Sequence, residues 1–321
     1  MDVIGYHASH EQFPPSALLE WVALAEQAGF DAAMCSDHLA PWGVRQGESG
    51  FSWSWLGAAL ARTSFSIGSV SSPVQRMHPV VSAQAIATLE EMFPGRFWTA
   101  LGSGEALNEH VTGDGWPEKP ERDRRLDEAQ SVIARLLAGE KVTHDGRVRV
   151  HQARLWTLPE TPPPLFAAAV CVETAVRVAP WADGLATVAQ PRETLERVLT
   201  GYRDAGGRGP AALQVHVCLT DDLDAGMRTV RDQWRHGALP PTRLWDISTP
   251  EEFDAAASDV TDEELRESVL ISDDADELAA RIADLVSVGF DRVYLHEVGP
   301  DQRSFIERAG RELLPALRAI A

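Results

Sequence analysis

An acid, an imidazole and an indole lie close together in the stretch 35–42, as Asp37, His38 and Trp42. Histidine exchanges protons near neutral pH, and a neighbouring carboxylate can tune it. The apolar run 30–34 before the stretch is typical of a strand, and Pro41 prevents a helix after it. The stretch therefore indicates either a strand end that carries proton-transfer chemistry or a capped strand end with a hydrogen-bonded histidine.

A second candidate follows the apolar run 97–101, where Gly102, Gly104 and Glu105 stand together. The glycines let backbone N–H groups approach a flat ligand, and Glu105 can offer a proton. A tight turn with a solvated acid is the alternative interpretation. The G-x-G-x-x-G fingerprint of dinucleotide binding does not follow the first expected strand, which argues against a Rossmann site.

Alternating strands and helices must position these residues. Apolar runs predict eight strands, at residues 3–7, 30–35, 65–70, 97–101, 165–168, 184–188, 213–218 and 292–296. Helical spacing predicts helices at 14–28, 79–92, 121–138, 192–202, 275–288 and 302–320, with one that begins near residue 173 and one that ends near residue 234. Residues 141–150 read as a hairpin turned at Asp145-Gly146, and residues 239–267 as an irregular segment with two short helices at most.

Eight strand–helix units predict an α/β fold, namely a single (β/α)8 TIM barrel with insertions that forms one domain over residues 1–321. An open doubly wound sheet is the alternative. In a barrel the C-terminal strand ends meet at one mouth. The residues expected at that mouth are His7, Ser9, Glu11, Asp37, His38, Trp42, residues 69–72, residues 102–109, residues 168–171, His296 and Glu297.

Composition and missing motifs exclude several classes of function. The net charge of -19 repels a phosphate backbone, so we expect no nucleic-acid partner. No apolar run approaches the length of a membrane-spanning helix, and residues 1–5 lack a signal-peptide pattern, so we expect no membrane partner and a cytoplasmic location. The three cysteines are far apart and read as reduced thiols. H-x-H, H-E-x-x-H and G-x-S-x-G do not occur, so neither a metal nor a nucleophilic triad is expected.

The strand-end motifs together resemble the luciferase-like flavin and deazaflavin oxidoreductase superfamily. Within it, the chain is similar to the coenzyme F420-dependent glucose-6-phosphate dehydrogenases and, more closely, to a subgroup described as probable non-F420 flavinoid oxidoreductases. The resemblance rests on residues 5–13, 36–42, 51–55, 102–109 and 301–305. It implies a hydride transfer between a flavin-type cofactor, coenzyme F420 or FMN, and a small organic substrate. An FMN-dependent monooxygenase that uses dioxygen is the alternative.

The resemblance also implies roles for single residues. His38 looks like the base that takes the substrate hydroxyl proton, and Glu105 looks like the proton donor or electrostatic partner near the ring. Trp42 and Glu11 resemble groups on the substrate side, and Asp37 resembles the acid that meets the ring edge. The other implied cofactor contacts are Ser69 and Val70, which the family joins by a cis peptide, together with Ser103, Gly104, Asn108, Ala168, Ala169, Val170 and Cys171.

The residues expected to bind the substrate differ from those of the glucose-6-phosphate dehydrogenases. The two lysines and the arginine that grip phosphate in that family fall at Pro191, Leu244 and Glu267, the last two beside Arg243 and Arg266. A desolvated phosphate dianion needs paired cations, so we do not expect glucose 6-phosphate to be the substrate.

The cofactor's phosphate position also differs, because the family's Gly-Gly pair falls at Val170-Cys171. This difference keeps both F420 and FMN open. The partners that we expect are a small-molecule substrate and a second copy of the chain in a homodimer.

Overall fold

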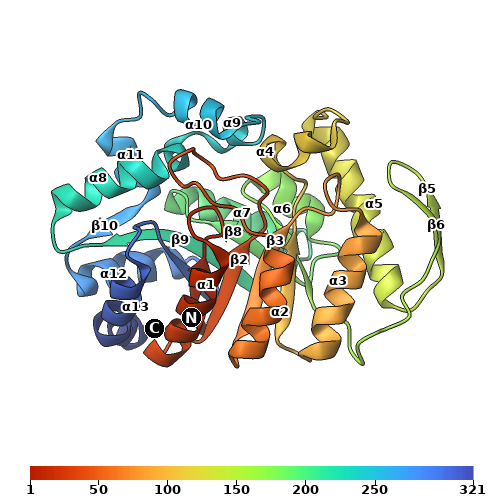
Figure 1. Cartoon of the computed structure of the whole chain (residues 1–321), viewed down its shortest axis with the longest axis horizontal. Helices are drawn as coiled ribbons and strands as arrows, with labels where there is room; N and C mark the ends of the chain where they lie inside the picture. The colour runs from red at the N-terminus through yellow and green to blue at the C-terminus, as the bar shows by residue number, and fades with distance from the viewer. Residues whose placement is uncertain (321) are drawn as a thin grey trace.

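Eight parallel strands close into a barrel surrounded by helices, which confirms the predicted (β/α)8 TIM barrel (Figure 1). The computed structural model describes residues 1–320, except the side chains of residues 241 and 242. In their order around the barrel the strands are β1 (Val3–Ala8), β2 (Ala32–Ser36), β3 (Ser66–Ser71), β4 (Phe97–Leu101), β7 (Leu165–Ala168), β8 (Gly184–Val188), β9 (Ala211–Leu219) and β11 (Arg292–Glu297). Each strand pairs with the next, and β11 returns to β1. A short strand, β10 (Leu270–Ser272), extends the sheet beside the end of β9.

Helices cover the outside of the barrel, and a hairpin projects from one end of the molecule (Figure 1). The α-helices are α1 (Pro15–Ala28), α2 (Ser52–Arg62), α3 (Pro79–Met92), α4 (Ala106–Glu109), α5 (Lys119–Leu137), α6 (Val172–Val178), α7 (Arg192–Asp204), α8 (Leu223–Trp234), α9 (Pro241–Leu244), α10 (Pro250–Ala256), α11 (Asp262–Ser268), α12 (Ala275–Val286), α13 (Gln302–Arg308) and α14 (Leu314–Ile320). Short turns of other helix types are η1 (His110–Thr112), η2 (Arg235–Ala238) and the π segment η3 (Ala309–Leu313). The hairpin consists of β5 (Val142–Asp145) and β6 (Arg149–Ala153).

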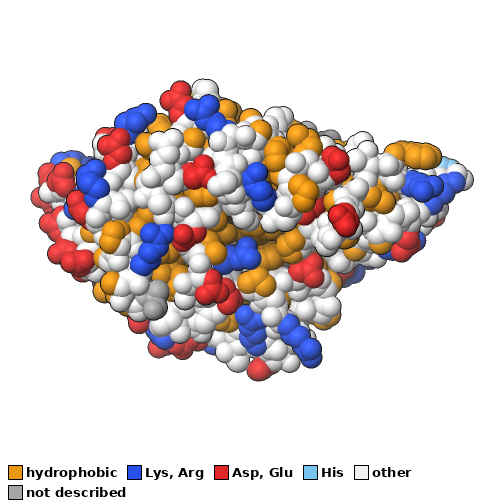
Figure 2. Space-filling model, turned by 90° about the horizontal axis from the view of Figure 1, so that it is seen from below, with side chains coloured by type: hydrophobic (Ala, Val, Ile, Leu, Met, Phe, Trp, Pro, Cys, Tyr) orange, Lys and Arg blue, Asp and Glu red, His pale blue; other side chains and the backbone are white. Residues whose placement is uncertain are grey.

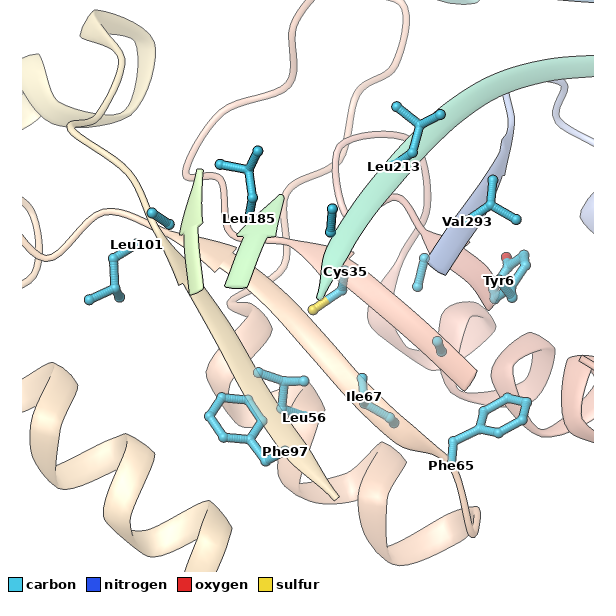
Figure 3. Packing of buried hydrophobic residues seen from close by; sticks show 14 of the residues in the cluster. Tyr6, Cys35, Leu56, Phe65, Ile67, Phe97, Leu101, Leu185, Leu213 and Val293 are labelled. Carbon is cyan, nitrogen blue, oxygen red and sulfur yellow. The ribbon is translucent and has the colours of Figure 1, made fainter. Parts of the chain in front are cut away.

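The two faces of the barrel strands bury different residues. Residues that alternate along each strand point outward into one core shared with the helices, where Leu56 of α2 packs near Ile67 and Phe97 (Figure 3). The inward residues form a smaller core that includes Trp98, Phe166 and Tyr294.

Two glycines make room for the large inward rings. A Cβ at Gly68 would lie 2.0 Å from Trp98, and a Cβ at Gly5 would lie 2.3 Å from Tyr294. These rings fill the lower barrel, so space for a ligand remains at the C-terminal mouth.

The prediction of a cis peptide bond between Ser69 and Val70 is wrong, because no peptide bond among the described residues is cis. The parallel ladder of β3 runs without interruption through both residues, which face Thr99 and Ala100 of β4. A cis bond before a residue other than proline costs about 3 kcal/mol, and this continuous pairing favours the trans form.

Other differences lie in the connections. The segment 239–267 forms three short helices, one more than expected, because Thr249 and Thr261 each cap a helix with their hydroxyl groups. The hairpin turns after Asp145, which still belongs to β5. The run 51–55 enters a helix, α2, that the sequence reading did not anticipate and that buries Trp53 and Trp55. The last predicted helix is interrupted by the π segment η3.

On the face shown in Figure 2, acidic and basic side chains are interspersed, and basic side chains form no continuous surface there. Within the described residues, no helix combines the length and the apolar character needed to cross a bilayer.

Candidate active site

A cavity of about 560 Å³ opens at the C-terminal ends of the barrel strands. A volume of this size is typical of sites for small molecules and cofactors. The predicted site residues that line it are Glu11, Asp37, His38, Trp42, Val70, Ser103, Gly104, Glu105, Asn108, Ala168, Ala169 and Val170. Ser69 and Cys171 are not in its lining. The structure therefore brings together most of the predicted residues from segments far apart in the chain.

His38 stands between two carboxylates. Its Nε2 lies 3.5 Å from Glu11 Oε1 and 3.7 Å from Glu105 Oε2, while its Nδ1 is buried without a partner among the described residues. Trp42 packs against the imidazole with ring centroids 4.8 Å apart. One ring nitrogen of His38 is thus the point where both carboxylates converge on the cavity.

Glu11 is held in the ionised form. Ser36 Oγ donates to Glu11 Oε2 at 2.6 Å, and Ser9 Oγ donates to the same oxygen at 3.1 Å. Burial opposes ionisation, but the attraction of His38 and the hydrogen bond from Ser36 outweigh it, so the net effect lowers the pKa of Glu11. Glu11 therefore places a fixed negative charge beside the imidazole.

Glu105 has the opposite character. Burial raises its pKa, His38 opposes this rise, and the charge of Glu11 adds to it. Asn108 Nδ2 donates to Glu105 Oε2 at 3.4 Å, and Asn108 Oδ1 accepts from the backbone N–H of Leu39 at 2.8 Å. The two carboxylates beside His38 thus differ in proton affinity, as expected for a pair that divides acid and base roles.

Asp37 is saturated by internal partners. Its carboxylate accepts from Ser71 Oγ at 2.6 Å, Ser52 Oγ at 3.0 Å and Trp53 Nε1 at 3.2 Å, and Arg76 Nη2 lies 3.1 Å away. The Asp37 side chain has no exposed surface. These contacts favour a role in fixing the chain at His38 rather than a direct contact with the edge of a ring.

Small residues form another part of the wall. Ala168, Ala186 and Ala212 line the cavity from β7, β8 and β9. Gly104 turns the loop after β4 with a φ of 83°, and a Cβ there would lie 2.9 Å from Ser72 Oγ. Methyl groups and a bare backbone turn leave room for a planar ring, so the residues present fit a flavin-type cofactor.

The cavity has few positive charges. Lys119 is the only lysine or arginine in its described lining, and its Nζ already contacts Asp123 and lies 3.4 Å from Thr174 Oγ1. Sequence reading missed Lys119, because no motif singled out the start of α5.

The three positions that would carry phosphate-binding cations in the sugar-phosphate enzymes line this same cavity. They are Pro191, Leu244 and Glu267. An acid, a proline and a leucine cannot pair with a phosphate dianion. The expected loss of the phosphate-binding cations therefore concerns residues that line the candidate active site.

Sequence reading also missed other polar residues of the lining, among them Gln214, His216 and His236. The first two are alternate residues of β9, and this spacing of two within an apolar strand was the available signal. His236 follows α8, and its ring stacks on Trp42 with centroids 5.4 Å apart. Nothing in the surrounding sequence predicts that contact.

Known proteins share this architecture. The family model described as luciferase-like monooxygenase matches residues 2–292. A protein of Microbacterium testaceum named F420-dependent glucose-6-phosphate dehydrogenase is 37% identical, over 98% of this chain and 97% of that protein. A protein of the same name from Nakamurella multipartita is 36% identical, over 98% and 96%.

Among solved structures, an F420-dependent secondary alcohol dehydrogenase in complex with an F420-acetone adduct is 31% identical, with a TM-score of 0.92 over 99% of this chain and 100% of that one. The F420-dependent tetrahydromethanopterin reductase of Methanopyrus kandleri is 21% identical with a TM-score of 0.77, over 99% and 100%, and shares the fold. The chain belongs to the luciferase-like monooxygenase family. Within it, the chain is an enzyme that groups with oxidoreductases named as F420-dependent.

Proposed function

We propose that this protein is an F420-dependent dehydrogenase of small, uncharged alcohols and the corresponding carbonyl compounds. The observation that carries the proposal is the convergence of Glu11 and Glu105 on Nε2 of His38 at the cavity wall. When bound, the deazaflavin ring of F420 accepts or donates a hydride. The names of the two relatives and of the secondary alcohol dehydrogenase structure support F420 as the cofactor.

The protein's own residues then handle the proton. His38 Nε2 takes the proton of the substrate hydroxyl group as hydride leaves the adjoining carbon. The ionised Glu11 stabilises the imidazolium that forms, because the two groups are only 3.5 Å apart. Glu105, whose pKa is raised, holds a proton to higher pH than a free glutamate. In the direction of carbonyl reduction, His38 Nε2 gives its proton to the substrate oxygen, and Glu105 then reprotonates that nitrogen. Trp42 packs against the imidazole and lines the same cavity.

The charge of the cavity supports an uncharged substrate. Glu264 and Glu267 line its wall, and Lys119, the single lysine of the lining that the structure describes, is paired with Asp123. An anionic substrate would lose its hydration without gaining paired cations. An alcohol or ketone needs only a proton-transfer partner and an apolar wall, which His38 and Leu244 supply.

The proposal is tested by mixing purified protein with F420 and either isopropanol or glucose 6-phosphate, and by following the loss of the cofactor's visible absorbance. We expect reduction with isopropanol and a rate lower by about 100-fold or more in His38→Asn. His151→Asn, which changes an exposed histidine of the hairpin, is the matched control. A wild-type rate in His38→Asn, or reduction with the sugar phosphate alone, would contradict the proposal.

Two earlier expectations stay predictions. FMN-dependent oxygenation predicts consumption of dioxygen with reduced FMN, which an oxygen electrode measures in the same preparation. The homodimer predicts twice the chain mass in sedimentation equilibrium.

A further inference from the structure

Two polar side chains of β9, Gln214 and His216, reach the cavity from inside the barrel. Leu213, Val215 and Val217 of the same strand are fully buried in the outer core. Gln214 and His216 are only partly buried, and residues two apart on a strand share one face. They form the β9 pair, to which the proposed proton transfer gives no role.

A chain of hydrogen bonds fixes the protons of this pair, beginning at a backbone carbonyl. Gln12 Nε2 donates to Val298 O at 2.9 Å, so the other amide atom, Gln12 Oε1, is the acceptor that faces His296 Nε2 at 2.8 Å. His296 Nε2 must therefore carry a proton. Burial lowers the pKa of His296 well below its usual range, so the ring is neutral and its Nδ1 has no proton.

The hydrogen bonds of Gln214 then determine which nitrogen of His216 carries the proton. Gln214 Nε2 lies 3.3 Å from His296 Nδ1 and 3.2 Å from His216 Nε2. An amide nitrogen carries two donors and no acceptor, so it donates one N–H to each ring. His216 Nε2 is then an acceptor.

Burial also keeps His216 neutral, because it lowers the pKa of this residue to about 3. Its single proton therefore stands on Nδ1. The β9 pair thus offers one donor, His216 Nδ1–H, and one acceptor, Gln214 Oε1. Among the described residues, the hydrogen bonds of this pair involve Gln214 Nε2 and His216 Nε2, and none involves either of these two atoms.

We propose that the β9 pair is a recognition site for an uncharged ligand group that presents an acceptor oxygen beside a donor. An imide or a hydroxyl group has this chemistry, whereas a phosphate or carboxylate needs a positive charge that a neutral imidazole lacks. This inference rests on the proposed function for the identity of its ligand. That function supplies two sources of such a group, namely the pyrimidinedione edge that F420 and FMN share and the hydroxyl group of the substrate.

Three variants separate recognition from packing. His216→Phe removes the donor and keeps a flat ring. His216→Asn keeps a donor, because the asparagine amide nitrogen can occupy the position of Nδ1. Gln214→Leu removes the acceptor and also the hydrogen bond to His216 Nε2 that keeps the His216 proton on Nδ1. His151→Asn is again the control, and circular dichroism checks that each variant is folded.

Equilibrium dialysis with F420 and with FMN measures cofactor binding without turnover, and the KM for isopropanol measures the substrate arm. If the β9 pair binds the pyrimidinedione edge of the cofactor, His216→Phe and Gln214→Leu weaken cofactor binding by about 5- to 20-fold, and His216→Asn weakens it much less. If the pair reads the substrate hydroxyl group, cofactor binding is unchanged and the KM rises by a similar factor. Either result supports the proposal and names the ligand.

The proposal is overturned if both quantities stay within twofold of wild type, or if His216→Asn behaves like His216→Phe. The proposed function can survive that result, because wild type would still bind F420 and oxidise the alcohol. Wild-type protein that binds neither cofactor would overturn both.

Discussion

Replacing Asp37 by asparagine should destabilise the fold by several kcal/mol. The carboxylate has no exposed surface and lies 3.1 Å from Arg76 Nη2, whose side chain is only 12% exposed. Removing one partner of a buried ion pair leaves the other charge uncompensated, which typically costs about 3 to 5 kcal/mol. In Asp37→Asn the new NH2 group must also face one of the groups that donate a hydrogen bond to the carboxylate in wild type, either Trp53 Nε1 or the Ser52 hydroxyl group.

Urea unfolding followed by tryptophan fluorescence measures this loss as a lower midpoint at unchanged slope. Asp145→Asn is the matched control, since Asp145 and Arg149 form a 3.8 Å pair with side chains that are 91% and 86% exposed. Exposed pairs contribute roughly 0 to 1 kcal/mol, so this control should unfold almost as wild type does. A loss below about 1 kcal/mol in Asp37→Asn would refute the reasoning that the buried pair and its hydrogen bonds hold the chain at His38.

Three further predictions concern single residues. Burial raises the pKa of Glu297 to about 7, so the stability that this residue contributes is present below about pH 4.5 and is lost as the pH rises through about 7. The free energy of unfolding should therefore fall by about 3 kcal/mol over that pH range in wild type and much less in Glu297→Gln. Gly104→Ala should lower stability by about 1 to 3 kcal/mol, because φ is 83° and the new Cβ would lie 2.9 Å from Ser72 Oγ; unchanged urea midpoints would contradict this. Burial raises the pKa of Glu105, so the limb of the kcat/KM profile that Glu105 controls should lie above pH 4.5 and disappear in Glu105→Gln, and a profile of wild-type shape in that variant would exclude the role.

Local signals were enough to predict most of the barrel. Gly29, with a φ of 99°, ends α1 directly after the last residue of the predicted helix 14–28, and Pro79 starts α3 at the expected residue. Barrel topology then requires strand ends to meet, which is why Glu11, His38 and Glu105 were predicted together and line one cavity.

The unpredicted parts depend on contacts distant in sequence. Arg76 lies 39 residues from Asp37, and no local pattern pairs them. The proton order of the β9 pair depends on Gln12 and His296, which are 284 residues apart. Ser69 points away from the cavity lining although its neighbour Val70 belongs to it, since successive strand residues face opposite sides.

The measurement that tests the central claim most directly follows a deuterium label. Isopropanol deuterated at its carbinol carbon is incubated with the protein and F420 without dioxygen, and the reduced cofactor is analysed by mass spectrometry. Direct hydride transfer to F420 predicts one deuterium in each reduced cofactor, with acetone as the product. Reduced cofactor without deuterium, or no reduction by the alcohol at all, would contradict the proposed dehydrogenase.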